Sequence, residues 1–219
     1  MPQPDDHPLT QLTLVRHGHV HNPQKILYGR LPRFHLSPEG LREAQSMAQS
    51  LKKQPLAAVF SSPLLRARQT AKQILIFHNA LKLRISKLLT EVYTPLEGCA
   101  SQKVDALGGD IYTGSMPPFE QPQDIVARVR KFFARIRKHY RGRQVVAVTH
   151  GDIITFMLLW ARDMALSPRY KRNLSVTGIS DPYPATVSMT TFIYRTGADD
   201  EHPEIVYTRP AKILNDPQG

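Results

Sequence analysis

The chain has 219 residues, a mass of 24.8 kDa and a formal net charge of +11, with 41% hydrophobic residues. This length and apolar content suit one domain around one core, and no apolar run approaches the roughly 18 residues that a membrane-spanning helix needs. Cys99 is the only cysteine, which excludes an intrachain disulfide and is compatible with a reducing compartment. Because acidic Asp5 and Asp6 stand where an export signal needs basic residues, we expect a cytoplasmic protein.

The positive charge is concentrated in one predicted helix. Eight lysines or arginines and no acidic residue lie within 128–143. Apolar residues recur there at helical spacing and predict a buried stripe made of Ile125, Val129, Phe132, Phe133, Ile136 and Tyr140. We interpret the basic residues as a solvated face whose field helps to attract an anionic substrate, and we expect no nucleic-acid and no membrane partner.

The predicted elements alternate along the chain. We expect strands at 12–15, 57–60, 83–88, 144–149, 187–195 and 204–208. We expect helices at 38–51, 63–78, 123–140 and 152–162, the first of them capped by Ser37 and started by Pro38. This alternation predicts an α/β fold with a three-layer, doubly wound, mostly parallel sheet that carries helices on both faces.

A single domain is expected at 12–208, between flexible ends at 1–11 and 209–219. The segment 90–122 is rich in proline and glycine, so we predict an irregular insertion that lies over the site.

Two predicted strands end in the same way. Arg16-His17-Gly18 follows the strand at 12–15, and Thr149-His150-Gly151 ends the strand at 144–149. Ligands of open α/β sheets bind outside the carboxyl ends of parallel strands. We therefore expect both imidazoles in one crevice, although they lie far apart in the sequence.

A third strand end is expected to join them. The strand at 57–60 runs into Ser62 and Pro63, which are typical of a helix cap and a first helical residue and would place Arg66 in the first turn. A cation near a helix N-terminus costs about 0.3–1 kcal/mol when exposed, so its presence there indicates a nearby anion. Together with Arg16 and backbone N–H groups, Arg66 would form an anion pocket beside the two histidines, and phosphate fits such a pocket.

These residues resemble the histidine phosphatase superfamily, which includes the cofactor-dependent phosphoglycerate mutases. The resemblance spans roughly Leu12 to Arg195 and rests on four blocks in the right order, namely Arg16-His17-Gly18, the run from Ser62 to Ala71, a glutamate near Glu91, and Thr149-His150-Gly151. It implies an α/β fold, a small phosphorylated substrate and no cofactor. A homo-oligomer remains possible.

The resemblance assigns roles to the basic residues. His17 would be the nucleophile that becomes phosphohistidine, because neutral imidazole is a competent nucleophile at cellular pH. His150 would hydrogen-bond the phosphoryl oxygens. Arg16 and Arg66 would clamp the phosphate, since a guanidinium fork matches two of its oxygens, whereas Arg68 is expected to point away to the surface.

Glu91 is the candidate general acid, which would protonate the leaving oxygen and then activate water. A dianionic phosphate nearby would raise the pKa of this carboxyl group. Glu97 is its rival, because the stretch between the glutamate and the following Glu-Gly pair is shorter here than in many relatives and contains Pro95.

Three further residues are expected to contact the substrate. Asn22 resembles a phosphate-contacting asparagine, but it comes one residue earlier after the histidine than in many relatives and is equally typical of a turn. Gly151 follows the second histidine. Arg30 belongs to the basic and aromatic segment 25–38, which favours an additional anionic group on the substrate.

We predict a metal-independent phosphomonoesterase that hydrolyses a small phosphorylated metabolite through phosphohistidine. A phosphoglycerate-mutase-type phosphoryl transferase is one alternative, although the extra segment that follows the glutamate in mutases is missing. The second is a metal-dependent hydrolase that uses the alternating His17, His19 and His21, with His150 and Asp152 as further ligands. The third is a non-catalytic module that binds a phosphorylated ligand or a polyanion.

Overall fold

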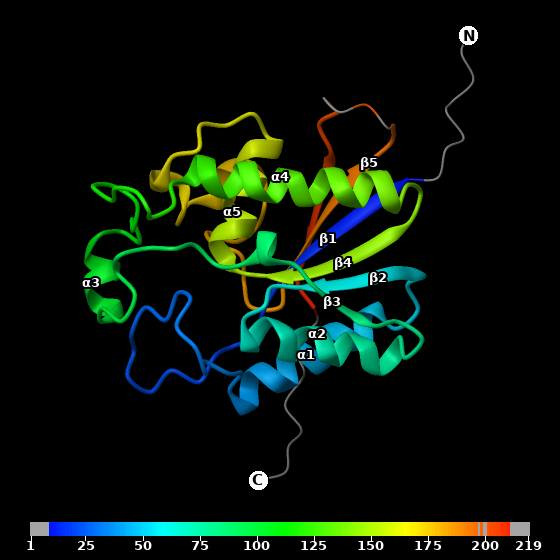
Figure 1. Ribbon diagram of the computed structural model, residues 1–219, viewed down its shortest axis with the longest axis horizontal. Helices are drawn as coiled ribbons and strands as arrows, with labels where there is room; N and C mark the ends of the chain where they lie inside the picture. The colour runs from blue at the N-terminus through cyan, green and yellow to red at the C-terminus, as the bar shows by residue number, and fades with distance from the viewer. Residues whose placement is uncertain (1–8, 197, 199–200, 211–219) are drawn as a thin grey trace.

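Six strands form one sheet in the order β3-β2-β4-β1-β5-β6 (Figure 1). The strands are β1 (Thr10–Arg16), β2 (Leu56–Ser61), β3 (Leu83–Ile85), β4 (Gln144–Thr149), β5 (Met189–Tyr194) and β6 (Glu204–Thr208). The first four in spatial order are parallel, and β5 and β6 are antiparallel to their neighbours. The sheet is therefore mostly parallel, as predicted. The computed structural model describes residues 9–196, 198 and 201–210.

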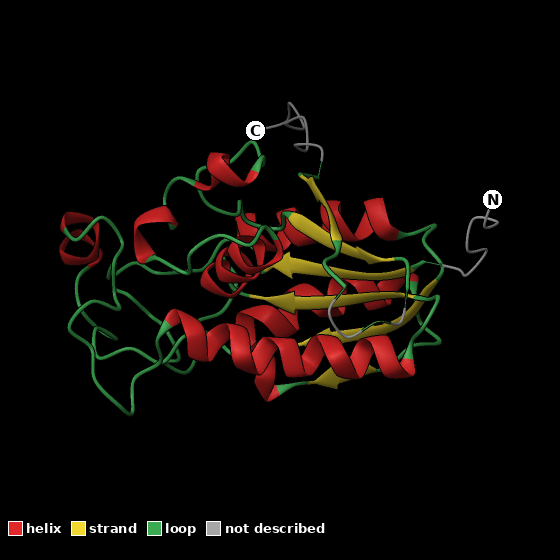
Figure 2. Ribbon diagram, turned by 90° about the horizontal axis from the view of Figure 1, so that it is seen from above, coloured by secondary structure: helices red, strands yellow, loops and turns green. Residues whose placement is uncertain are grey.

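Helices cover both faces of the sheet, which confirms the predicted three layers (Figures 1 and 2). The helices are α1 (Pro38–Leu51), α2 (Leu65–Phe77), α3 (Ser101–Ala106), α4 (Pro122–His139) and α5 (Gly151–Ala161), with short 3₁₀ turns η1 (Lys87–Leu89), η2 (Pro168–Tyr170) and η3 (Leu174–Thr177). Side chains of a strand alternate between the faces, so Leu14 and Val145 pack in the core under α4 and α5, whereas Val15 and Val146 pack in the core under α1 and α2.

The basic stretch forms α4 as predicted. Its apolar stripe is buried apart from Tyr140, which is half-buried at the C-terminal end, and Arg130, Lys131, Arg135 and Lys138 are exposed. No helix in the described part of the chain is long and apolar enough to cross a membrane.

Helix starts were predicted with mixed success. Ser37 caps α1, where its Oγ accepts a hydrogen bond from Gly40 N at 3.0 Å. The prediction that Ser62 caps α2 is wrong, because Leu64 still has extended backbone and α2 begins at Leu65. The Ser62 hydroxyl instead lies 2.7 Å from His150 Nε2, at the base of the site.

Other parts of the chain also differ from the prediction. Strand β1 begins at Thr10, inside the segment predicted to be flexible; the other predicted flexible residues fall mostly outside the described part of the chain. The strand predicted at 83–88 stops at Ile85 and is followed by η1, because its partner β2 ends at Ser61 and offers no further pairing. The insertion 90–122 is not wholly irregular, since it contains α3.

The parallel strands bring two histidines to one edge of the sheet. The register pairs Arg16 at the end of β1 with Thr149 at the end of β4. The next residues, His17 and His150, leave the sheet side by side, and His17 N donates a hydrogen bond to Thr149 O at 3.1 Å.

A close backbone contact fixes the turn after β1 against α1. A Cβ atom added to Gly18 would lie 2.4 Å from Gly40 O, and one added to Gly40 would lie 1.9 Å from His19 O. We expect Gly40→Ala to lower the free energy of unfolding by about 3 kcal/mol, since overpacking forces the backbone apart. Urea denaturation measures this, with Gln45→Ala on the exposed side of α1 as the control that changes stability by about 0.5 kcal/mol at most. Equal stability of both variants would contradict the close contact.

Candidate active site

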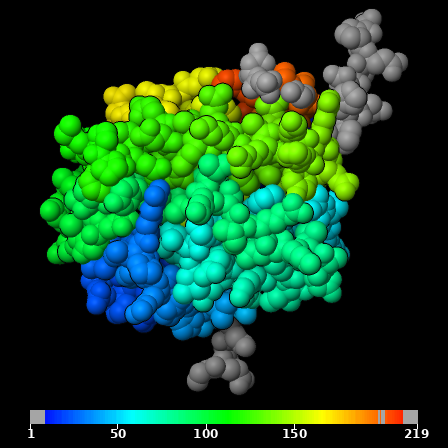
Figure 3. Space-filling view, in the orientation of Figure 1, coloured from blue at the N-terminus to red at the C-terminus, as the bar shows by residue number. Residues whose placement is uncertain are grey.

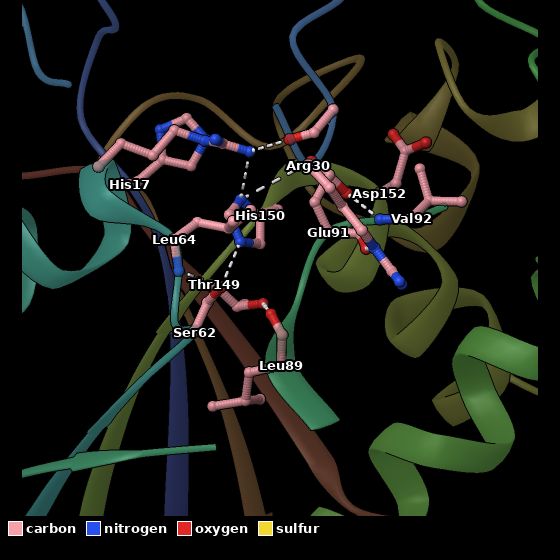
Figure 4. Close-up of polar contacts among 12 residues, drawn as sticks. His17, Arg30, Ser62, Leu64, Leu89, Glu91, Val92, Thr149, His150 and Asp152 are labelled. Atoms are coloured by element: carbon pink, nitrogen blue, oxygen red, sulfur yellow. Dashed lines mark hydrogen bonds and ion pairs between the residues drawn. The ribbon is translucent and has the colours of Figure 1, made fainter. Parts of the chain in front are cut away.

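The site lies where β1, β2 and β4 end and α2 and α5 begin. The rings of His17 and His150 have centroids 5.2 Å apart, so the structure brings both predicted imidazoles into one crevice. Figure 4 shows His150 between His17 on one side and Glu91 on the other. Arg66, in the first turn of α2, reaches both histidines.

Hydrogen bonds define the tautomer of His17. Its Nδ1 lies 2.8 Å from Gly18 O, and because a carbonyl oxygen only accepts, Nδ1 carries the proton. Nε2 then holds a free electron pair, which accepts a hydrogen bond from Arg66 Nε at 3.2 Å. Burial and the positive charges of Arg66 and Arg16 lower the pKa of His17 well below its ordinary value. The ring is therefore a neutral imidazole with its electron pair in the site.

His150 is fully buried and uses both ring nitrogens. Arg66 can only donate, so the 3.3 Å contact from its Nη2 makes Nδ1 of His150 an acceptor, and Nε2 then donates to Ser62 Oγ. Burial and the charge of Arg66 lower the pKa of His150 well below its ordinary value. Glu91 Oε2 lies 3.8 Å from Nδ1.

Arg66 is a buried cation without a bonded counter-ion. It is 1% exposed, its Nη2 donates to Gly29 O at 2.7 Å, and its guanidinium lies 4.7 Å from the ring centroid of Tyr28. Among the described residues it forms no ion pair. A charge buried in this way is costly unless it is paired, so the site is suited to an anion.

Arg16, at the end of β1, lines the cavity together with His17. Its Nη1 donates to Pro184 O at 2.6 Å, and its guanidinium stacks on Tyr183 at 5.0 Å from the ring centroid. Its Nε is buried and has no hydrogen-bond partner among the described residues. Arg16 thus keeps a donor available for a ligand. Arg68 is exposed on α2, as expected from its spacing.

The two candidate acids lie in different places. Glu91 lines the cavity, and its Oε1 accepts from Val92 N at 2.9 Å. Burial and the negative charge of Asp152 raise the pKa of Glu91 to about 7. Glu97 instead accepts a hydrogen bond from Arg30 N at 2.6 Å and does not line the cavity. The structure therefore brings Glu91, and not Glu97, to the histidines.

The three expected substrate contacts have different surroundings. Asn22 lines the cavity, but its amide exchanges two hydrogen bonds with the backbone of Ile26, at 2.9 and 3.2 Å, as a turn asparagine does. Gly151 lines the cavity under Tyr183, whose hydroxyl would lie 2.1 Å from an added Cβ. Arg30, by contrast, does not line the cavity.

Arg30 lies outside the cavity because acceptors elsewhere hold its guanidinium. Nε donates to Glu91 O at 2.7 Å, and Nη2 pairs with Glu120 Oε2 at 2.7 Å. Arg30 thus supports the backbone of Glu91.

A buried polar network beside Glu91 was missed by the sequence interpretation. Asp152 is 3% exposed and accepts hydrogen bonds from Tyr112 and Tyr183, at 2.5 and 2.6 Å, and its Oδ2 lies 2.7 Å from Lys171 Nζ. The sequence contained one signal for this network, because Asp152 stands at the start of an apolar helix. An unpaired carboxylate buried there would lower the stability of the fold.

The alternating histidines do not form a metal site. His19 is exposed and its Nδ1 lies 2.8 Å from Ser37 Oγ, while the ring of His21 stacks on His35. In the described part of the chain, no three histidine, cysteine, aspartate or glutamate side chains gather as a metal-holding group.

The site opens into a cavity of about 560 Å³. Its lining includes the site residues Arg16, His17, Glu91, Gly151 and Asp152. Two chain segments, 20–37 and 90–120, lie against each other at this end of the molecule and form part of the wall (Figure 3). Leu27 N donates to Cys99 O at 2.8 Å, which ties the two segments together.

The fold and the site together place this chain in a class of α/β proteins. Members of this class carry two histidines and a buried arginine at the carboxyl edge of a mostly parallel sheet. Residues 12–181 match the model of the histidine phosphatase superfamily (branch 1), and the chain belongs to this family. This confirms the resemblance found in the sequence.

Relatives cover nearly the whole chain. An uncharacterized protein of Mycobacterium tuberculosis is 33% identical over 213 residues, which cover 93% of this chain and 98% of that protein. The structure is similar to a mycobacterial glucosyl-3-phosphoglycerate phosphatase, with 22% identity, a TM-score of 0.71 and coverage of 91% and 97%. It is also similar to phosphoserine phosphatase from Entamoeba histolytica in complex with 3-phosphoglyceric acid, with 24% identity, a TM-score of 0.68 and coverage of 90% and 94%. The structural likenesses establish a shared fold.

Proposed function

We propose that this protein is a metal-independent phosphomonoesterase that hydrolyses a small phosphorylated metabolite through a phosphohistidine at His17. The observation that carries the proposal is the free electron pair of His17 Nε2, which points at a buried arginine that forms no ion pair with any residue the structure describes. The anion site at Arg66 can hold a phosphate group next to His17, which can then attack the phosphorus atom of a phosphate ester. Family membership and the phosphatases among the similar structures support the same function.

In the first step, Nε2 of His17 attacks phosphorus and the bond from phosphorus to the ester oxygen breaks. Glu91 gives its proton to the leaving oxygen, so the alcohol departs neutral. A pKa of about 7 leaves a useful fraction of Glu91 protonated at neutral pH. Arg66 and Arg16 turn their N–H groups to the phosphoryl oxygens and balance the charge that develops there.

In the second step, water attacks the phosphohistidine. Glu91, now a carboxylate, takes a proton from this water, the phosphorus–nitrogen bond breaks and inorganic phosphate leaves. His150 donates from Nδ1 to a phosphoryl oxygen in both steps. The charge of the bound phosphate raises the pKa of this buried imidazole, so the ring takes up a proton from solvent when the substrate binds and releases it when inorganic phosphate leaves.

Chelation tests the metal-independent part of the proposal. We expect hydrolysis to survive exhaustive treatment with EDTA and to be inhibited by vanadate, which resembles the five-coordinate phosphoryl group. The matched variants His19→Gln and His21→Gln should keep the wild-type rate, because these side chains lie outside the histidine pair. Loss of activity on chelation, with recovery on addition of zinc or manganese, would contradict the proposal.

A further inference from the structure

The cavity extends beyond the histidines, and its farther wall combines apolar side chains with two ion pairs. The lining runs from His17 as far as α3. Ile26 and Leu27 contribute one part of this wall, and the buried Val104 and Ile111 contribute another. Apolar walls favour an apolar ligand group, because its transfer from water to the cavity is favourable.

The cations on the farther wall are already paired. Lys171 is buried between Asp152 Oδ2 and Gly109 O, at 2.7 and 2.9 Å. Arg172 pairs with Asp105 at 2.5 Å, and both carboxylates line the cavity with their cations. At the buried Lys171, a second anionic group on the substrate would be attracted by the cation but repelled by Asp152, and it would lose its hydration. Arg172 and Asp105 are exposed, so solvent weakens the attraction that this pair offers to an anion.

The segment 25–38 does not supply a further cation. Arg30 is paired with Glu120, Lys25 and Arg33 are exposed, and none of the three lines the cavity. The sequence-based expectation of an additional anionic group on the substrate therefore loses its basis. The charged side chains in the described lining are Arg16, the titratable Glu91 and two ion pairs. Each ion pair has no net charge.

We propose, resting on the phosphomonoesterase function above, that the alcohol part of the substrate is uncharged and largely apolar. In this arrangement the phosphoryl group lies at His17, Arg16 and Arg66, and the organic group lies against Ile26, Leu27, Val104 and Ile111. The paired Lys171 keeps a donor for a neutral acceptor such as a hydroxyl or amide oxygen. The volume of about 560 Å³ accommodates a phosphoryl group with an organic group of several carbon atoms.

Three matched esters test this selectivity: benzyl phosphate, 4-carbamoylbenzyl phosphate and 4-carboxybenzyl phosphate. They share a benzylic leaving group, and the last two differ only by an amide in place of a carboxylate. We expect kcat/KM of the benzyl and carbamoyl esters to exceed that of the carboxy ester by at least about tenfold. The net charge of +11 would favour the carboxy ester at long range, so this order has to come from the cavity.

A wall variant tests the location. Val104→Thr keeps the shape of the side chain but replaces a methyl group by a hydroxyl group, so we expect kcat/KM of benzyl phosphate to fall about fivefold. Methyl phosphate is too short to reach this wall, and its kcat/KM should stay unchanged. Equal losses for both esters would overturn the assigned wall.

A binding measurement tests this inference independently of the proposed phosphatase function. The corresponding phosphonates, in which carbon replaces the ester oxygen, cannot be hydrolysed, and calorimetry should show the carbamoyl compound bound at least about tenfold more tightly than the carboxy compound. This binding order without turnover of any ester would overturn the phosphatase function and support the cavity inference. Equal or tighter binding of the carboxy compound would overturn the inference, whatever the turnover.

Discussion

Replacing His17 by alanine will abolish hydrolysis of phosphate monoesters, with a fall in kcat of at least about 10⁴-fold. The reason is that Nε2 of His17, which lines the cavity, carries the electron pair that attacks phosphorus in the proposed mechanism, whereas His150 donates to a phosphoryl oxygen. Steady-state kinetics on a set of phosphorylated metabolites, starting with those that the wild type hydrolyses fastest, measures the fall in kcat. Circular dichroism and thermal unfolding establish that the variant is folded.

The matched control is His19→Ala. His19 is a neighbouring histidine that is exposed and lies outside the cavity lining, so its loss should leave kcat within about twofold of the wild type. A folded His17→Ala variant that keeps one-tenth of the wild-type rate would show that another group is the nucleophile.

Replacing Glu91 by glutamine will lower the rate of hydrolysis of alkyl phosphates by about 10²–10⁴-fold. The rate of hydrolysis of 4-nitrophenyl phosphate will fall far less. An alkoxide needs a proton as it leaves, whereas 4-nitrophenolate does not. The pKa of about 7 also gives the sign of the pH dependence: Glu91 is protonated below that value, so kcat/KM of the wild type for alkyl phosphates falls as the pH rises through about 7. Glutamine does not titrate, so this part of the profile should disappear in the variant.

Glu97→Gln is the control for the acid. Its carboxylate accepts a hydrogen bond from Arg30 N, away from the histidines, so the variant should keep the wild-type dependence on the leaving group. A selective loss on alkyl phosphates in Glu97→Gln, with none in Glu91→Gln, would reverse the assignment.

The convergence of His17 and His150 could be predicted because it depends on a rule of sheet architecture. Each follows a short β-branched strand, and parallel neighbours present their carboxyl ends at one edge. The position of Arg66 was also predictable, although α2 begins at Leu65 and not at Pro63. Either start leaves Arg66 in the first turn, so an error in the boundary did not move the residue from the site.

The sequence could not decide between Glu91 and Glu97, because the choice depends on contacts between distant segments. The carboxylate of Glu97 is held by the backbone of Arg30, and that contact follows from packing of the segment 20–37 on the segment 90–120. Local spacing carries no information on such packing. The same contacts hold the guanidinium of Arg30 away from the cavity.

The network around Asp152 was unpredictable for a related reason. Tyr112, Lys171 and Tyr183 come from three loops, and no short motif connects them. Their placement depends on how the insertion 90–122 and the chain after α5 meet over the carboxyl edge of the sheet. Burial of Asp152 at the start of an apolar helix indicates that partners are needed, but it does not indicate which residues provide them.

The formation of phosphohistidine is the central claim, and rapid quenching tests it most directly. Wild-type protein mixed with a substrate labelled in its phosphoryl group and quenched within one turnover should carry the label in an acid-labile, base-stable bond. Peptide mapping should place that label on His17, and the His17→Ala variant should carry none. Label on a serine or aspartate, or hydrolysis at full rate with no labelled protein at any quench time, would contradict the account.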